Sequence, residues 1–237
     1  MDELFDAVEG VASEFSMSTS ELLFRGHSSI DYKLLPTLHR AGKISSERSI
    51  FYSYKSHATS LNGGIKTNWD TILDMQHYGL PTRLLDWTNS LGTALYFALK
   101  GDPASPCIWL LDPYTLNEIS TSYPILYDTS SLPDLGGDQD LNIGQIMAGN
   151  CSIEKPYAIR PPHGNSRISA QRGFFTVHTN SPEPIEKLCP EAVRRIDINP
   201  DDIARFKRQL KYLSIDEFAM FPDRDGLAAY LKSAHNL

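Results

Sequence analysis

Cysteine is scarce in this sequence: the chain has three among 237 residues, at positions 107, 151 and 189. No two of them form a C-x-x-C pair, so the sequence gives neither a zinc-binding motif nor a disulfide framework. No apolar run approaches the length of about 18 residues that a membrane-spanning helix requires. The acidic start of the chain lacks the basic and then apolar order of a secretion signal. These absences predict a cytoplasmic protein with reduced thiols and no membrane partner.

Several motifs that would identify a chemistry are also missing. The sequence contains no G-x-G-x-x-G, no G-x-x-x-x-G-K and no G-x-S-x-G, which argues against the common dinucleotide fold, the P-loop and the nucleophile elbow. The seven histidines include no pair four residues apart beside a carboxylate, so we predict no metal site. The net charge of -7 argues against non-specific coating of nucleic acid, although one strand could still enter a local cleft.

What the sequence does contain is an ordinary globular composition, with 41% hydrophobic and 22% charged residues. Residues 113–166 are rich in turn-forming residues and are expected to hold short strands and loops. Because no repeat or linker interrupts the chain, we predict a single domain over residues 1–237. Apolar spacing predicts helices near 2–16, 47–60, 70–78, 91–100 and from 203 onward, and strands near 22–25, 107–111, 173–179 and 194–198.

The densest group of polar and aromatic side chains lies at residues 75–90, which we interpret as a turn between two helices. Loops held by rigid elements often carry binding and catalytic residues. A structural alternative is that Arg83 and Asp86 form an ion pair while Trp87 fills the core. The cluster as a whole favours function.

Arg25 is a second candidate because it ends an expected strand and precedes Gly26. A guanidinium group can bind a phosphate or carboxylate through two parallel hydrogen bonds, and glycine lets a ligand approach the backbone. A surface salt bridge is an equally good interpretation of so short a motif.

These two segments carry a resemblance to a known family. The sequence resembles the FRG domain, which is named after its phenylalanine–arginine–glycine motif and occurs in bacteria and phages. The resemblance covers about residues 20–232. Its motifs lie at residues 24–26 (FRG), 76–88 (QHYGLPTRLLDWT), 94–98 (ALYFA), 167, 171–176 (QRGFFT) and 221–226 (FPDRDG).

The order of these motifs is also similar to that of NAD-dependent ADP-ribosyltransferases, most of all the DNA-modifying branch. In that comparison Arg25 stands at the first motif, Thr88 and Ser90 at the second, and Gln171 at the third. The third position is a glutamate in the transferases, and glutamine supplies neither its charge nor a base. The resemblance therefore implies a weak transferase, a site completed by another acid such as Asp86 or Glu154, or a domain that only binds nucleotide.

The resemblance implies an α+β fold with a small, split, mostly antiparallel sheet flanked by helices. It also implies that NAD is the substrate and that Arg25, Asp86 and Gln171 converge on one cleft. Arg25 would hold an NAD phosphate, and Asp86 and Gln171 would orient the ribose. His77 and Tyr78 would line the nicotinamide pocket, with the Tyr78 ring stacking on the ligand. Arg83, Thr88 and Ser90 complete the expected cofactor site. Arg83 is expected mainly to brace Asp86.

The leading expectation is thus an ADP-ribosyltransferase-like toxin or defence effector that modifies a nucleic acid or a protein, with an antitoxin or defence protein as partner. A second expectation, from another class, is a non-catalytic module that senses a nucleotide or binds a partner. A third is a nucleotide hydrolase in which Asp86 and His77 act as acid and base.

Overall fold

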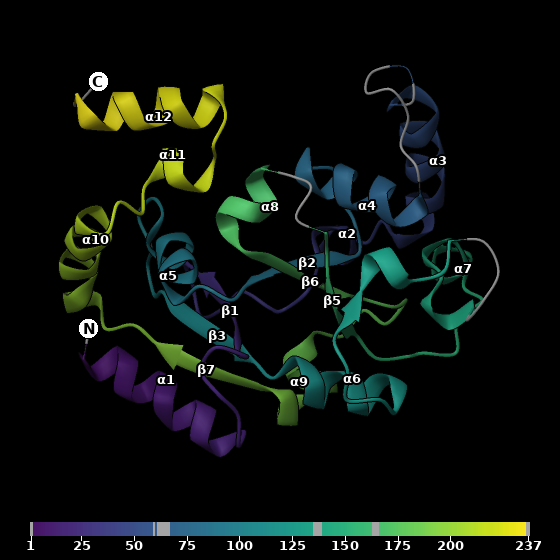
Figure 1. The fold of residues 1–237 in the computed structure, drawn as a ribbon, viewed down its shortest axis with the longest axis horizontal. Helices are drawn as coiled ribbons and strands as arrows, with labels where there is room; N and C mark the ends of the chain where they lie inside the picture. Colours follow the sequence, from purple (N-terminus) through teal and green to yellow (C-terminus); the bar gives the residue numbers. More distant parts are fainter. Residues whose placement is uncertain (1, 59, 61–66, 135–138, 163–165, 236–237) are drawn as a thin grey trace.

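The computed structural model describes residues 2–58, 60, 67–134, 139–162 and 166–235. Strands and helices alternate irregularly along the chain (Figure 1). The strands are β1 (Leu23–His27), β2 (Leu84–Thr88), β3 (Cys107–Leu111), β4 (Tyr127–Asp128), β5 (Tyr157–Arg160), β6 (Gly173–Val177) and β7 (Val193–Asp197). The helices are α1 (Asp2–Glu14), α2 (Thr37–Arg40), α3 (Glu47–Ala58), α4 (Asn68–His77), α5 (Leu91–Leu99), α6 (Pro113–Thr121), α7 (Ile143–Ala148), α8 (Ser166–Gln171), α9 (Ile185–Leu188), α10 (Ile203–Tyr212), α11 (Glu217–Met220) and α12 (Arg224–Ala234).

The described strands form one seven-stranded sheet in the order β4-β5-β6-β2-β1-β3-β7. Within this described sheet, only β4 and β5 pair in parallel, and the other neighbouring strands are antiparallel. The prediction of a mostly antiparallel sheet flanked by helices is therefore confirmed. The expected small, split sheet is instead a continuous sheet across the residues that the structure describes.

The centre of this sheet is its weakest junction. β1 pairs with β3 along its whole length, and β2 does the same with β6. Between β1 and β2, in contrast, the pairing recorded for these described strands is limited to Phe24 opposite Thr88. The two strands therefore separate beyond this pair, and main-chain groups near the gap need other partners.

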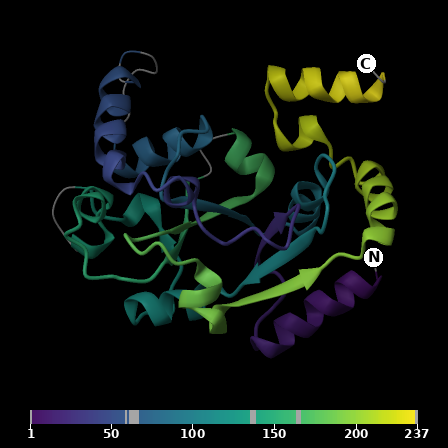
Figure 2. The same cartoon turned by 180° about the vertical axis from the view of Figure 1, so that it is seen from behind.

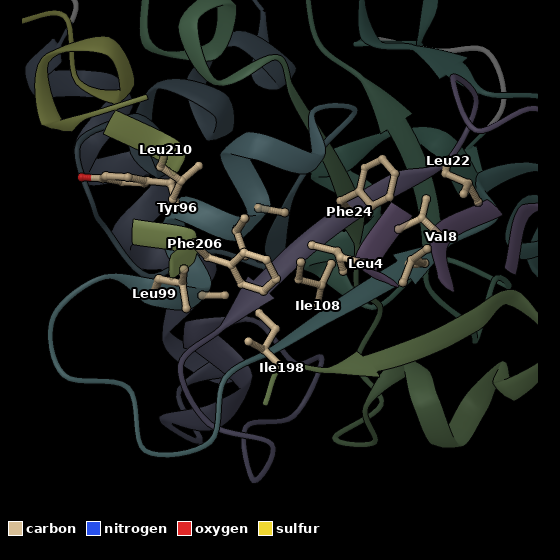
Figure 3. Packing of buried hydrophobic residues seen from close by; sticks show 14 of the residues in the cluster. Leu4, Val8, Leu22, Phe24, Tyr96, Leu99, Ile108, Ile198, Phe206 and Leu210 are labelled. Atoms are coloured by element: carbon tan, nitrogen blue, oxygen red, sulfur yellow. The ribbon is translucent and has the colours of Figure 1, made fainter. Parts of the chain in front are cut away.

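Helices cover both faces of the sheet. On one face, α1, α5 and α10 pack on β1 and β3 through a cluster that includes Leu4, Phe24, Leu99, Ile108 and Phe206 (Figure 3). On the same face, α3, α4 and α7 cover β2, β5 and β6. The opposite face packs against α6 and α9. Figures 1 and 2 show α10, α11 and α12 at one end of the molecule and α3 and α7 at the other.

Two segments near the expected site fold differently from the prediction. Residues 84–88 were expected within a turn, but they form β2 because β6 pairs with them along their whole length. No helix was expected at residues 166–171, but they form the short helix α8, and the strand expected near residues 173–179 begins at Gly173. Among the described residues, no helix has the length and apolar character needed to cross a membrane.

Candidate functional site

A cavity of about 440 Å³ opens beside the gap between β1 and β2. Its walls come from both strands and from α5 and α8, so residues far apart in the sequence meet there. Of the predicted site residues, the cavity brings together Arg25, Asp86, Thr88 and Gln171. Its volume is in the range of ordinary small-molecule sites.

Arg25 spans the gap between the two central strands. Its Nη1 donates to the main-chain oxygen of Asp86 at 2.6 Å and lies 3.7 Å from Oδ2 of the same residue. Its Nε donates to Nε2 of His27 at 3.0 Å. Burial lowers the pKa of the Arg25 guanidinium, and the charge of Asp86 opposes that shift. The side chain thus replaces missing strand pairing and places a positive charge in the cavity wall.

His27 accepts a hydrogen bond from Arg25 as a neutral imidazole. Burial, with smaller contributions from the charges of Arg25 and Arg40, lowers the pKa of its imidazole to about 3. Because Nε2 accepts the hydrogen bond from Arg25, the ring proton belongs on Nδ1. His27 therefore positions Arg25 and is not an acid or base near neutral pH.

Asp86 is the carboxylate of the cavity, and 56% of its side chain is exposed. Gln76, at the end of α4, donates from Nε2 to Oδ2 of Asp86 at 3.0 Å. The hydroxyl of Thr82 donates to Oε1 of Gln76 at 2.5 Å and accepts from the main-chain N–H of Leu84 at 3.1 Å. This chain of hydrogen bonds fixes the orientation of the Gln76 amide, so its donor group faces Asp86.

Gln171 and Thr88 tie α8 to β2. The side-chain amide of Gln171 donates to the main-chain oxygen of Met220 at 3.0 Å, so α11 holds this group. The hydroxyl of Thr88 donates to the main-chain oxygen of Gln171 at 2.7 Å and accepts from the N–H of Ser90 at 3.0 Å. Ser90 caps α5 by accepting from the N–H of Thr93. In this structure, Thr88 and Ser90 therefore order the backbone around the cavity.

His77 and Tyr78 lie to one side of the main cavity. His77 lines a small adjoining pocket of about 40 Å³, together with Asp86 and Gln171. Burial, and next the charge of Arg167, lower the pKa of the His77 imidazole. Tyr78 is 64% exposed and meets the His77 ring edge-on, with the ring centroids 4.7 Å apart. The pair is thus near Asp86, with Tyr78 on the surface of the protein.

Arg83 has a different partner from the one expected. Its guanidinium is fully buried and pairs with Glu47 at the start of α3, with Nε 3.0 Å from Oε1 and 2.9 Å from Oε2. Its Nη1 also donates to the main-chain oxygen of His178 at 2.9 Å. The expectation that Arg83 braces Asp86 is wrong, because these buried acceptors hold the guanidinium and Asp86 is held by Arg25 and Gln76.

Sequence reasoning missed several residues of the cavity. Arg40 and Tyr32 come from the segment after β1, and Arg167 comes from α8. No local pattern marks Tyr32 and Arg40, because only the folded chain brings them to Arg25, whereas Arg167 is among the motif positions of the resemblance but was given no role in the site. Among the described residues that line the cavity, three arginines face one aspartate. This balance favours an anionic ligand in a protein whose overall charge is negative.

A second cavity, of about 520 Å³, lies among α5, α10, α11 and α12 and is lined by Lys100, Lys207 and Lys211. These lysines have a structural explanation. Lys100 and Lys211 stand at the ends of α5 and α10, where exposed carbonyl groups favour a positive charge, and Lys207 donates to the main-chain oxygen of Gly101 at 2.8 Å. The basic face of α10 thus needs no ligand to explain it.

Glu154, the other acid considered, lines a third cavity, with Cys151 and Lys155. The structure therefore places Asp86, and not Glu154, beside Arg25. In the described part of the chain, no group of three or more histidine, cysteine, aspartate or glutamate residues is arranged to hold a metal ion.

Comparison with known proteins gives one match. No curated protein and no solved structure matches the chain. The matching family model covers the strand with Arg25, the segment with Asp86 and the helix α5, which together form much of the cavity. It ends before α8 and the C-terminal helices, so the expected motifs around Gln171 and Phe221 lie outside it. Residues 20–106 match the FRG domain, so this part of the chain is similar to that family.

Proposed function

We propose that this protein is an ADP-ribosyltransferase-like enzyme that uses NAD as its substrate. The observation that carries the proposal is the meeting of Arg25, Asp86 and Gln171 in one cavity. They come from β1, from β2 and from the residues directly before β6, and β2 lies between β1 and β6 in the sheet. This is the motif order in which the sequence resembles the transferases.

In the proposed reaction, the bond between the ribose C1′ and the nicotinamide nitrogen breaks, and its electron pair leaves with nicotinamide. A nucleophile of the acceptor, on a nucleic acid or a protein, then bonds to C1′ and loses its proton. Arg25 would bind a phosphate of NAD. The carboxylate of Asp86 would stabilise the positive charge that develops on the ribose.

The arrangement around Asp86 supports these separate roles for Arg25 and Asp86. Gln76 donates to Oδ2 of Asp86, and Arg25 donates to the main-chain oxygen of Asp86. About half of the Asp86 side chain remains exposed. Gln171 is neutral, and its amide is already bonded to Met220. The charge that the third motif lacks would therefore come from the second strand. A toxin or defence role, with an antitoxin or defence partner, belongs to the same proposal.

A nucleotide-sensing module without catalysis is the second candidate. The observation that favours it is Gln171 itself, because a bound amide at this position supplies no negative charge. The three arginines of the cavity would serve binding equally well with or without a reaction.

Nicotinamide release from NAD, measured for wild type and three variants, tests the proposal. We expect Arg25→Ala to abolish release and Asp86→Asn to reduce it by about 10²-fold or more, as for loss of a charge-stabilising group. Gln171→Glu should not raise release, because it replaces the donor to Met220 with a carboxylate that faces a carbonyl oxygen. Arg194→Ala is the matched control, since Arg194 pairs with Glu14 on the surface.

One outcome would contradict the enzyme, and a second would contradict only the role given to Asp86. NAD binding by folded wild type without any release, with cell lysate as acceptor, would leave the sensing module. Full activity of Asp86→Asn with a gain in Gln171→Glu would mean that the third motif, and not Asp86, carries the charge. A labelled macromolecule in the lysate would identify transfer, and release without a label would identify NAD hydrolysis.

A further inference from the structure

Tyr32 presents an aromatic ring at the cavity. It follows β1 in the segment that leads to α2, and 53% of the residue is exposed. It lines the same cavity as Arg25, and its ring meets the His27 ring edge-on, with centroids 6.0 Å apart. A single exposed tyrosine on a surface needs no explanation, but this one stands beside two arginines in a concave site.

The segment that carries Tyr32 is anchored on both sides. Before it, the hydroxyls of Ser29 and Ser105 lie 3.4 Å apart. After it, Leu34 is fully buried, its N–H donates to Oε2 of Glu186 at 3.2 Å, and its oxygen accepts from Ile185 at 3.2 Å. The backbone of Tyr32 is therefore ordered before any ligand arrives, which lowers the entropy cost of binding.

Arg40 brings a second fixed cation to the same part of the cavity. Its Nη2 donates to the hydroxyl of Thr37 at 2.9 Å, one turn earlier in α2. The charge of Arg40 reaches both Arg25 and His27, because it lowers the pKa of each. An aromatic ring next to two guanidinium groups matches a ligand with a flat base at one end and phosphates at the other.

We propose that Tyr32 and Arg40 form a nucleotide subsite, in which a purine stacks on Tyr32 and its diphosphate lies between Arg40 and Arg25. The ligand class is thus a purine nucleoside diphosphate, either free or as one half of a dinucleotide. This inference rests on the proposed function in using the same cavity, but it requires no transfer reaction. It also assigns stacking to Tyr32 instead of the surface residue Tyr78.

Calorimetric titration with ADP, NAD and inorganic pyrophosphate tests the subsite. We expect Tyr32→Ala to weaken ADP about 10-fold or more, the usual loss for a stacked base, and to leave pyrophosphate unchanged. Tyr32→Phe should bind ADP like wild type, because it keeps the ring. Arg40→Ala should weaken ADP and pyrophosphate by the same factor. Tyr212→Ala, at an 82% exposed tyrosine on α10, is the matched control.

Each other result overturns the subsite. Wild type that binds neither ADP nor NAD would do so, as would a Tyr32→Ala variant that loses ADP and pyrophosphate equally or loses neither. These experiments can reject the nucleotide subsite and the proposed transferase activity independently of each other. Tyr32-dependent ADP binding without nicotinamide release keeps the subsite and rejects the transferase. Nicotinamide release with a KM for NAD that is unchanged in Tyr32→Ala does the reverse. Comparing ADP with NAD shows whether the free nucleotide or the dinucleotide is preferred.

Discussion

Gly26 is the place where a strand and a helix touch through their backbones. A Cβ atom at this position would lie 1.9 Å from the main-chain oxygen of Ala94 and 2.6 Å from the nitrogen of Ala98. The glycine was expected to admit a ligand to the backbone, but here it admits α5. Its absent side chain lets α5 lie on β1, and this contact carries Ala94 and Phe97 to the cavity. The third residue of the F-R-G motif thus shapes the site through packing.

Gly26→Ala should therefore destabilise the protein by about 3 kcal/mol, at the upper end of the usual cost of overpacking, because two rigid backbones must move apart. Gly10→Ala is the matched control. Gly10 lies inside α1 with no atom within 4 Å of its added Cβ, so alanine should stabilise the protein by about 0.5–1 kcal/mol. Urea unfolding of both variants measures the difference. Equal stability of Gly26→Ala and wild type would show that α5 does not pack as described.

At the scale of elements, a buried ion pair connects the first residue of α3 to the residue directly before β2. Glu47 and Arg83 are both almost fully buried, and the guanidinium also binds the carbonyl of His178 after β6. Three elements that are distant in sequence therefore depend on one charged pair. Such a pair gives modest net stability, but the loss of one partner leaves an uncompensated charge in the interior.

We expect Glu47→Ala to lower the free energy of unfolding by about 3–5 kcal/mol. Replacing both partners with apolar residues, as in Glu47→Leu with Arg83→Met, should recover much of that loss, since no buried charge is left. The matched control is Glu183→Ala, which removes an exposed ion pair with Lys187 and should cost less than about 0.5 kcal/mol. Thermal and urea unfolding would measure the free energies of unfolding of these variants. A double variant that is less stable than Glu47→Ala would contradict this account.

The elements also show what could be predicted from the sequence. Apolar spacing located α3, α4 and α5 to within a few residues, and the apolar run at 107–111 is β3. β2 could not be found in this way, because its pairing with β6 depends on residues almost 90 positions away, Asp86 opposite Phe175 for example. The motif order indicated Arg25, Asp86 and Gln171. Tyr32 and Arg40 could not be found, since only tertiary packing places them beside Arg25. Gln76 opens the 76–88 motif, but its hydrogen bond to Asp86 could not be foreseen from the sequence.

At the scale of the whole molecule, buried neutral histidines link stability to pH. Burial lowers the pKa of His27 to about 3, and it also lowers the pKa values of His39 and His178. The unfolded chain binds protons at these residues below about pH 6.5, whereas the folded protein binds them only at lower pH. The contribution of these histidines to stability is therefore fully present above about pH 6.5 and is lost as the pH decreases toward 3.

For His27 alone, lowering the pH from 8 to 5 should reduce the free energy of unfolding by about 2 kcal/mol. His27→Gln retains an acceptor for Arg25 and does not titrate, so its stability should fall by about 2 kcal/mol less over this interval. The exposed His57 gives the control variant His57→Gln. Urea unfolding at both pH values measures the effect. The same pH dependence in His27→Gln and wild type would mean that His27 is protonated in the folded protein.

The two halves of the sheet meet along a seam that backbone pairing closes only at Phe24 and Thr88 among the described strand residues. Arg25 belongs to one half and Asp86 to the other, and the hydrogen bond from Nη1 to the Asp86 carbonyl crosses the seam. Any motion that widens the seam pulls these two residues apart. A ligand bound by both residues would hold the two halves of the sheet together. Separation of the halves and release of the ligand would therefore be mechanically coupled.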